Sequence, residues 1–198
     1  MRKNRLEALS DGVIAIIITI MVLELKVPHG HTFYDLQPLI PKFISYVLSF
    51  LYLAIYWNNH HHMLHTVKHV TGGILWSNIH LLFWLSLIPF TTAWMGENNF
   101  ETIPMALYGF VLLMTAIAYF VLQRLIIKNH GKESILSKAI GKDYKGKVSP
   151  ILYTLAIVSC WISPWLAGTI YFLVTFIWLI PDSRIEIIFN EEEVEKQI

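Results

Sequence analysis

A group of histidines is the part of this sequence whose residue types and spacing are most suited to binding a metal. His60, His61, His62, His65 and His69 fall within ten residues. If the segment is helical, His61, His65 and His69 recur at i, i+4 and i+8 and share one face. Zinc accepts imidazole readily, and two histidines one turn apart are a common half-site. A small metal-ion transporter that uses the histidines from His60 to His69 is therefore the main alternative function for this chain.

The surroundings of these histidines favour another interpretation. No acidic residue lies between Asn58 and Thr71, whereas metal sites within membranes usually add a carboxylate from another span. We expect the histidines to be hydrogen-bonded or to lie at an interface, and we predict no metal site. Because histidine titrates near neutrality, a role in pH sensing is the remaining alternative.

Other kinds of chemistry have no recognisable signature. The sequence contains no His-Glu-x-x-His, no Gly-rich phosphate loop and no nucleophile with a base at a known spacing. Cys160 is the only cysteine, which excludes an intramolecular disulfide and a dithiol redox pair. The formal net charge of +1 gives no clustered basic face for nucleic acid. We therefore expect neither an enzyme nor a nucleic-acid-binding protein, and no cofactor.

Composition indicates a protein that crosses a lipid bilayer several times. Apolar residues make up 55% of the chain and charged residues 15%, and the mean hydropathy is +0.53. Soluble domains are typically about 45–50% apolar and about 25% charged. The uncharged stretches 43–59 and 72–95 approach or exceed the roughly 20 residues of helix that a hydrocarbon core requires. The basic N-terminus before an apolar run superficially resembles a signal peptide, but Glu7 and Asp11 interrupt it, so we expect it to remain in the mature protein.

Hydropathy and breaker residues predict an all-α polytopic membrane protein, with residues 1–198 forming a single transmembrane domain. Pro89 should kink the third helix, Pro164 suits the first turn of the sixth, and Pro150 should lie near a helix end. The last two helices are short for full spans, so a re-entrant hairpin is the alternative there. The six helices are expected at residues 5–25, 41–70, 73–95, 102–128, 149–163 and 164–180, with a linker at 129–148 and an acidic tail at 182–198.

The distribution of lysine and arginine predicts the orientation in the membrane. Six spans place both termini on one side, and thirteen of these residues fall on that side, leaving only Lys26 and Lys42 opposite. Loops on the cytoplasmic side carry such an excess. We therefore expect both termini to be cytoplasmic, and the linker and the tail to be solvated cytoplasmic segments.

The first helix differs from the others. Only twelve uncharged residues separate Asp11 from Glu24, and they cover about 18 Å of a core about 30 Å thick. A helix with charges at this depth is expected to be shielded by other helices or to line a wet cavity. One stripe at helical spacing contains Gly12, Ile16, Thr19, Ile20 and Leu23. By itself this stripe indicates either ordinary helix packing or a hydrophobic constriction that gates a pore by dewetting.

The segment Arg5-Leu6-Glu7-Ala8-Leu9-Ser10-Asp11 resembles the Arg-x-x-x-Phe-Ser-Asp signature of the transmembrane protein 175 family, the endolysosomal and prokaryotic potassium channels. Leu9 stands where the family usually has phenylalanine, which weakens an aromatic contact and keeps the polar residues. Two further stretches are similar to the family, Trp57-Asn58-Asn59-His60-His61 and residues 78–97 around Ser86-Leu87-Ile88-Pro89-Phe90. The resemblance covers about the first half of the chain and points to the prokaryotic single-repeat branch.

This resemblance implies a potassium-permeable cation channel, weakly selective over sodium, that assembles as a homotetramer in the plasma membrane. The first helix is then expected to line a central pore that K⁺ and other monovalent cations enter. The chain has no Thr-Val-Gly-Tyr-Gly loop to replace the hydration shell of potassium. Counting from the Ser-Asp pair, the narrowest apolar ring falls at Ile16, with Ile20 and Leu23 along the same face and Thr19 as the candidate for cation preference.

The signature residues themselves are expected to hold the bundle together. Asp11 lies about 140° round the helix from Ile16 and should point into neighbouring helices. Unpaired polar groups inside a bilayer are costly. We therefore expect hydrogen bonds between the first and second helices near their cytoplasmic ends. The predicted network comprises Arg5, Leu9, Ser10, Asp11, Trp57 and His60.

Overall fold

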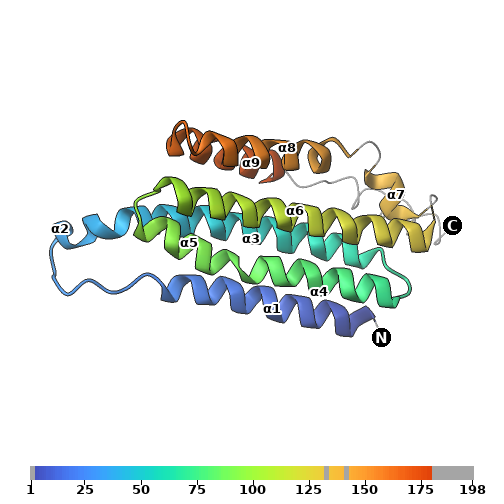
Figure 1. Cartoon of the computed structure of the whole chain (residues 1–198). Helices are drawn as coiled ribbons and strands as arrows, with labels where there is room; N and C mark the ends of the chain where they lie inside the picture. Colours follow the sequence, from blue (N-terminus) through green and yellow to red (C-terminus); the bar gives the residue numbers. More distant parts are fainter. Residues whose placement is uncertain (1–2, 132–133, 141–142, 180–198) are drawn as a thin grey trace.

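The computed structural model describes residues 3–131, 134–140 and 143–179, and all regular structure among them is helical. The long helices lie side by side in a bundle (Figure 1). The predicted all-α class is confirmed. The elements are α1 (Lys3–Leu23), α2 (Phe33–Leu36), the 3-10 helix η1 (Gln37–Leu39), α3 (Ile40–His65), α4 (Gly72–Ser86), α5 (Ile88–Glu97), α6 (Thr102–His130), α7 (Ile135–Ile140), α8 (Tyr144–Ser159) and α9 (Pro164–Leu179).

Among the residues that the structure describes, four apolar segments are long enough to cross a membrane. They are Lys3–Leu23, Phe33–His65, Gly72–Glu97 and Thr102–His130. The helices α8 and α9 have 16 residues each and extend only about 24 Å. They form an antiparallel pair beside α6 (Figure 1), in which Trp178 Nε1 near the end of α9 donates to Ser149 Oγ near the start of α8 (2.7 Å).

The second predicted helix is too long at its C-terminal end. Residues 41–70 were expected to be helical, but α3 ends at His65. The Thr66 hydroxyl donates to the Met63 carbonyl (2.7 Å) and the Val67 amide to the Leu64 carbonyl (2.9 Å), which closes the last turn. A new helix then begins after Thr71, whose side chain accepts from the Ile74 amide.

The predicted linker at 129–148 is also wrong in part. α6 continues to His130, α7 forms within the segment, and α8 begins at Tyr144 because the Asp143 carboxylate caps it by accepting from the Gly146 amide (3.1 Å). Pro150, expected near a helix end, lies inside α8. The predicted tail at 182–198 lies outside the described residues.

The third predicted helix, at 73–95, is divided in two. α4 ends at Ser86 and α5 begins at Ile88, with Leu87 between them. Pro89 lies in the first turn of α5. Backbone N–H groups in a first turn have no acceptor within the helix, so a proline there costs no hydrogen bond. α5 contacts α1, and its residues Phe90, Trp94 and Glu97 line a groove with the second half of α1.

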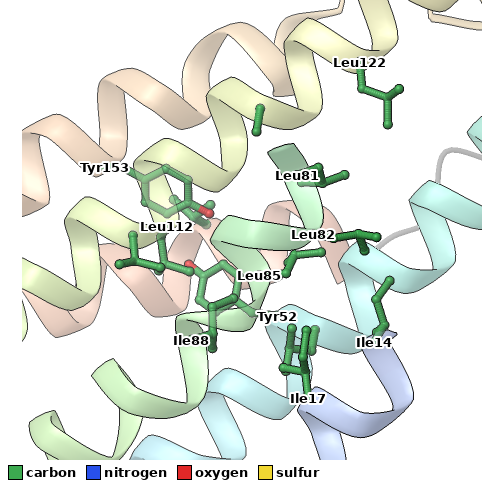
Figure 2. Packing of buried hydrophobic residues seen from close by; sticks show 14 of the residues in the cluster. Ile14, Ile17, Tyr52, Leu81, Leu82, Leu85, Ile88, Leu112, Leu122 and Tyr153 are labelled. Carbon is green, nitrogen blue, oxygen red and sulfur yellow. The ribbon is translucent and has the colours of Figure 1, made fainter. Parts of the chain in front are cut away.

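The interior combines an apolar core with hydrogen bonds between helices. Ile14 and Ile17 of α1 belong to one buried cluster with Leu85 of α4 and residues of α3 and α6 (Figure 2). Deeper in the bundle, Thr92 Oγ1 donates to Ser49 Oγ (2.7 Å), which lies 3.0 Å from the Tyr108 hydroxyl. Such bonds help to hold helices together in a bilayer, because lipid tails are as apolar as the side chains and supply no hydrophobic driving force for helix association.

Small residues bring two of these helices close together. A Cβ atom added at Gly96 of α5 would lie 2.8 Å from the Cα of Lys42 on α3 and 2.5 Å from Ser45 Oγ. Only glycine permits this approach of the two helices. The contact fixes α5 against α3 at the end of the bundle opposite the N-terminus of α1.

Candidate functional site

The helix α1 has two faces with different surroundings. Its buried face packs on the rest of the subunit and consists of Leu6, Ser10, Ile14, Ile17 and Met21. The stripe predicted from spacing lies on the other face, where Ile16 is 59% exposed, Ile20 44% and Leu23 69%. The subunit therefore does not bury this stripe in its own core.

The hydroxyl of Thr19 is also on the exposed side of α1. Thr19 Oγ1 donates its hydrogen to the Ile16 carbonyl (2.9 Å). A hydroxyl oxygen has acceptor lone pairs in addition to its one donor. With the donor used by the backbone, the oxygen is free to present its lone pairs outward to a cation.

An open groove of about 630 Å³ runs between α1 and α5. Ile16 and Ile20 line the α1 wall, and Phe90 and Trp94 line the α5 wall. The two aromatic rings are stacked, with centroids 6.3 Å apart and planes inclined by 17°. The groove also includes the carboxylates of Glu24 and Glu97, which lie beyond α1 and at the end of α5. Ile16 and Ile20 of the exposed stripe thus form part of a concave, mainly apolar surface that also includes acidic groups.

The signature residues form two separate contacts between helices. Trp57 Nε1 of α3 donates to Asp11 Oδ1 of α1 (3.0 Å). Asp11 therefore points away from the exposed stripe, as the angular argument predicted. This bond joins α1 to α3 across their outer surface.

The second contact passes through a residue that the predicted network omitted. Asn78 of α4 donates from Nδ2 to Ser10 Oγ (2.9 Å), and its Oδ1 lies 2.7 Å from His60 Nε2. Because the amide oxygen can only accept, the ring nitrogen is the donor. Ser10, His60 and Asn78 are all buried. Ser10 and His60 were predicted to meet directly, but the amide of Asn78 lies between them and uses both its ends.

Two members of the predicted network take no part in it. Arg5 is exposed, and no hydrogen bond or ion pair joins it to a described residue. Leu9 is 46% exposed. A signal for the missing member was present in the sequence, since an amide side chain in the middle of the apolar helix α4 requires partners.

The histidines do not share a helix face as predicted. α3 ends at His65, so His69 lies in the following loop and not one turn further along. The His61 ring lies near Trp57 and His65, with centroids 6.1 Å and 6.4 Å away. Among residues 3–131, 134–140 and 143–179, no group of three or more His, Cys, Asp or Glu side chains has the arrangement of a metal site.

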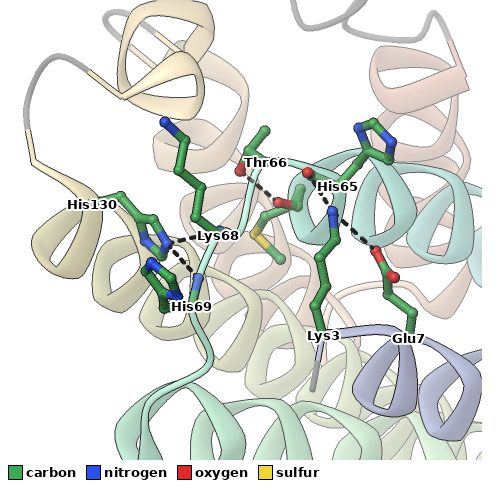
Figure 3. A network of polar contacts seen from close by, with 8 residues as sticks. Lys3, Glu7, His65, Thr66, Lys68, His69 and His130 are labelled. Carbon is green, nitrogen blue, oxygen red and sulfur yellow. Dashed lines mark hydrogen bonds and ion pairs between the residues drawn. The ribbon is translucent and has the colours of Figure 1, made fainter. Parts of the chain in front are cut away.

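Polar contacts hold the N-terminal end of α1 (Figure 3). Lys3 Nζ donates to the His65 carbonyl at the end of α3 (2.7 Å) and lies 3.6 Å from Glu7 Oε1. At the opposite end of the bundle, Lys42 Nζ pairs with Glu97 Oε1 (3.0 Å). A lysine thus makes a cross-helix contact at each end of the bundle.

Comparisons with known proteins agree with this arrangement. The sequence model described as endosomal/lysosomal potassium channel TMEM175 matches residues 5–89. The chain is 55% identical over 186 residues to a potassium channel of Chryseobacterium sp. (strain P1-3), covering 94% of this chain and 97% of that protein. It is 33% identical over 124 residues to a potassium channel of Streptomyces collinus, covering 59% of this chain and 60% of that one.

A solved structure has the same fold. The crystal structure of a lysosomal potassium-selective channel TMEM175 homolog from Chamaesiphon minutus matches with a TM-score of 0.78 and 29% identity, covering 91% of this chain and 97% of that chain. These relatives are membrane channels and not enzymes, in agreement with the absence of a catalytic motif in the sequence. From the extent and identity of these matches, the chain belongs to the TMEM175 family.

Proposed function

We propose that this chain is one subunit of a potassium-permeable cation channel, a homotetramer in which α1 lines a central pore. Membership of the TMEM175 family supports the channel class, and the Chryseobacterium relative, which is named a potassium channel, matches nearly the whole chain. The proposed location is the plasma membrane, with both termini cytoplasmic. The excess of lysine and arginine on that side supports the orientation.

The observation that carries the proposal is the division of α1 into two faces. One apolar stripe is buried against the subunit, yet a second, containing Ile16, Ile20 and Leu23, is exposed on the opposite side. Rotation of identical subunits about an axis brings the same exposed face of each copy to the centre. Four Ile16 side chains then form an apolar neck, which water leaves when it is narrow and re-enters when α1 tilts outward.

Cation preference is assigned to Thr19. Its hydroxyl oxygen is exposed one turn from Ile16, and its hydrogen is already donated to the backbone. Four such oxygens replace only part of a hydration shell, whereas a filter of stacked carbonyl rings replaces all of it. Selectivity for potassium over sodium is therefore expected to be weak.

The acidic residues near the groove support cation entry from the side opposite the termini. Glu24 and Glu97 both line the groove that contains Ile16. Carboxylates at the mouth of a narrow path raise the local concentration of cations, an effect that falls with ionic strength. Glu97 is also paired with Lys42, so we assign Glu24 the larger share of this effect.

Potassium flux into liposomes that contain the purified protein tests the proposal. We expect downhill potassium flux, slower sodium flux, and faster flux of both ions with Ile16→Asn, because a polar ring keeps the neck hydrated. Val22→Asn is the matched control, since Val22 is an exposed residue of α1 (45%) about 120° away from Ile16. Flux only in the presence of zinc, or transport of zinc itself, would contradict the proposal and favour a metal-ion transporter.

A further inference from the structure

His130, the last residue of α6, joins three backbone groups through one half-buried ring, and Figure 3 shows two of them, those of Lys68 and His69. Its Nδ1 lies 3.0 Å from the Ile126 carbonyl oxygen of its own helix. Its Nε2 accepts from the Lys68 amide (3.0 Å) and from the His69 amide (3.3 Å). These two amides belong to the α3–α4 loop, residues 66–71. In the sequence, Lys68 lies 62 positions and His69 61 positions from His130.

These partners determine the protonation state of the ring. A carbonyl oxygen only accepts, so Nδ1 must carry a hydrogen. Backbone amides only donate, so Nε2 must have a free lone pair. His130 is therefore neutral in this arrangement, with its hydrogen on Nδ1. A second proton on Nε2 would remove the acceptor and direct an N–H group at two other N–H groups.

The loop held by His130 is continuous with the anchor of α1. Its first residue, Thr66, follows His65, whose carbonyl accepts from Lys3 Nζ (2.7 Å). Lys3 is the first described residue of α1, and its ion pair with Glu7 holds the side chain in place. Contacts thus run without interruption from α6 through the loop to the cytoplasmic end of the helix that carries Ile16, about 20 Å further along.

We propose that His130 is a proton-sensitive latch that couples cytoplasmic pH to the position of α1. The neutral ring clamps the α3–α4 loop to α6 and keeps the cytoplasmic end of α1 in place. The protonated ring releases the loop, so that α1 tilts about its contacts at Ser10 and Asp11 and widens the neck at Ile16. This inference rests on the proposed channel function and assigns a means of regulation to the same pore helix.

The charges around the latch favour release once the ring is protonated. The loop contributes Lys68 and His69, so a positive charge on His130 adds to a basic environment and repels the segment that it held. The segments that these contacts join carry Lys3 and Glu7 of α1, His62 and His65 of α3, Lys68 and His69 of the loop and Lys128 of α6. Glu7 is the acidic residue among them, and Lys3 already pairs with it.

Nuclear magnetic resonance tests the latch independently of any ion flux. Protein labelled with ¹⁵N-histidine and ¹⁵N-lysine is placed in nanodiscs, and the His130 signals are identified as those missing from His130→Gln. At about pH 8 we expect the tautomer with hydrogen on Nδ1; at about pH 5 we expect both nitrogens protonated. The amides of Lys68 and His69 should then exchange faster with solvent, after correction for intrinsic rates. A hydrogen on Nε2 at the higher pH, or unchanged amide protection, would overturn the proposal.

Potassium currents across patches of giant liposomes, with pH changed only on the cytoplasmic face, test the coupling. Acidification should increase the wild-type current by about tenfold, the effect expected when one or two hydrogen bonds bias a two-state equilibrium. His130→Gln retains an acceptor that does not titrate, and its current should stay at the low level at each pH. His130→Leu has no acceptor, and its current should stay at the high level.

His69→Gln is the matched control, because His69 contributes only its backbone amide to the latch and the variant removes a neighbouring titrating ring. It should keep the wild-type pH response. An unchanged pH response in His130→Gln, or its loss in His69→Gln alone, would overturn the coupling. Absence of potassium current in every variant at every pH would instead overturn the proposed channel function, and the spectrum would still decide whether His130 holds the loop.

Discussion

The indole nitrogen of Trp57 on α3 lies 3.0 Å from a carboxylate oxygen of Asp11 on α1. This bond and the Ser10–Asn78–His60 chain hold the same part of α1 from two sides, against α3 and against α4. The exposed stripe that begins at Ile16 follows directly after this fixed region. A rigid base of this kind gives a pore-lining helix a defined orientation.

Replacing Trp57 tests the first contact. Trp57→Phe keeps an aromatic ring and removes the donor, which leaves Asp11 without its partner. Loss of a hydrogen bond to a charged group should lower the free energy of unfolding by about 1–3 kcal/mol. The measurement is thermal unfolding of the detergent-solubilised protein. Trp76→Phe, at a tryptophan that is 70% exposed, is the control, and equal destabilisation by both variants would contradict the assigned role.

Replacing Asn78 tests the second contact. Asn78→Leu leaves both Ser10 and His60 buried without the amide that joins them, so the subunit should be destabilised. In a double-mutant cycle with His60→Leu, the coupling energy should be about 0.5–2 kcal/mol, the range found for hydrogen bonds inside membranes. Unfolding in bicelles supplies the four free energies. Additive effects of the two substitutions would show that the bond contributes nothing.

The selectivity assigned to Thr19 predicts a change in ion preference. Thr19→Val removes the hydroxyl with little change of shape, and the ratio of potassium to sodium permeability should fall by about twofold to fivefold, equivalent to about one weak hydrogen bond. Thr19→Ser keeps the hydroxyl and should keep the ratio. Reversal potentials under bi-ionic conditions measure it. An unaltered ratio in Thr19→Val would remove Thr19 from the selectivity site.

The ion pair between Lys42 and Glu97 should matter little for stability. The Glu97 side chain is 53% exposed, and pairs of this kind contribute about 0–1 kcal/mol.

Glu24→Gln, by contrast, should lower the potassium conductance at low ionic strength, because it removes charge from the mouth of the pathway. The deficit should disappear at about 1 M salt, where charges are screened within about 3 Å. A deficit that is independent of salt would indicate a structural defect.

The sequence predicted the fold class because charge-free segments of sufficient length specify membrane helices almost independently of tertiary structure. The end of α3 was harder to predict. Residues 66–70 contain no proline or glycine, and the helix ends in a turn closed by the Thr66 side chain. The helix at 135–140 and the cap at Asp143 were not predicted either, because the lysines of this segment indicated a solvated linker.

The candidate site was predicted in part. Spacing alone placed Ile16, Thr19 and Leu23 on one face, since helical periodicity is a local property. Periodicity does not reveal whether a helix face packs against its own subunit or is exposed on the subunit surface. The structure shows which face packs inward, because it buries the other side of α1. The role of Asn78 depends on how α4 approaches two other helices, so no spacing within the sequence could specify its partners.

Block by cadmium of a cysteine placed at Ile16 is the most direct test of the central claim that this face of α1 lines the pore. The substitution is made in a Cys160→Ala background, because Cys160 is buried and is the only native thiol. Thiolates gathered at one axis bind soft metal ions strongly. We expect rapid block of the potassium current in Ile16→Cys and none in Val22→Cys. Equal block of both variants, or an unaffected current in Ile16→Cys, would contradict it.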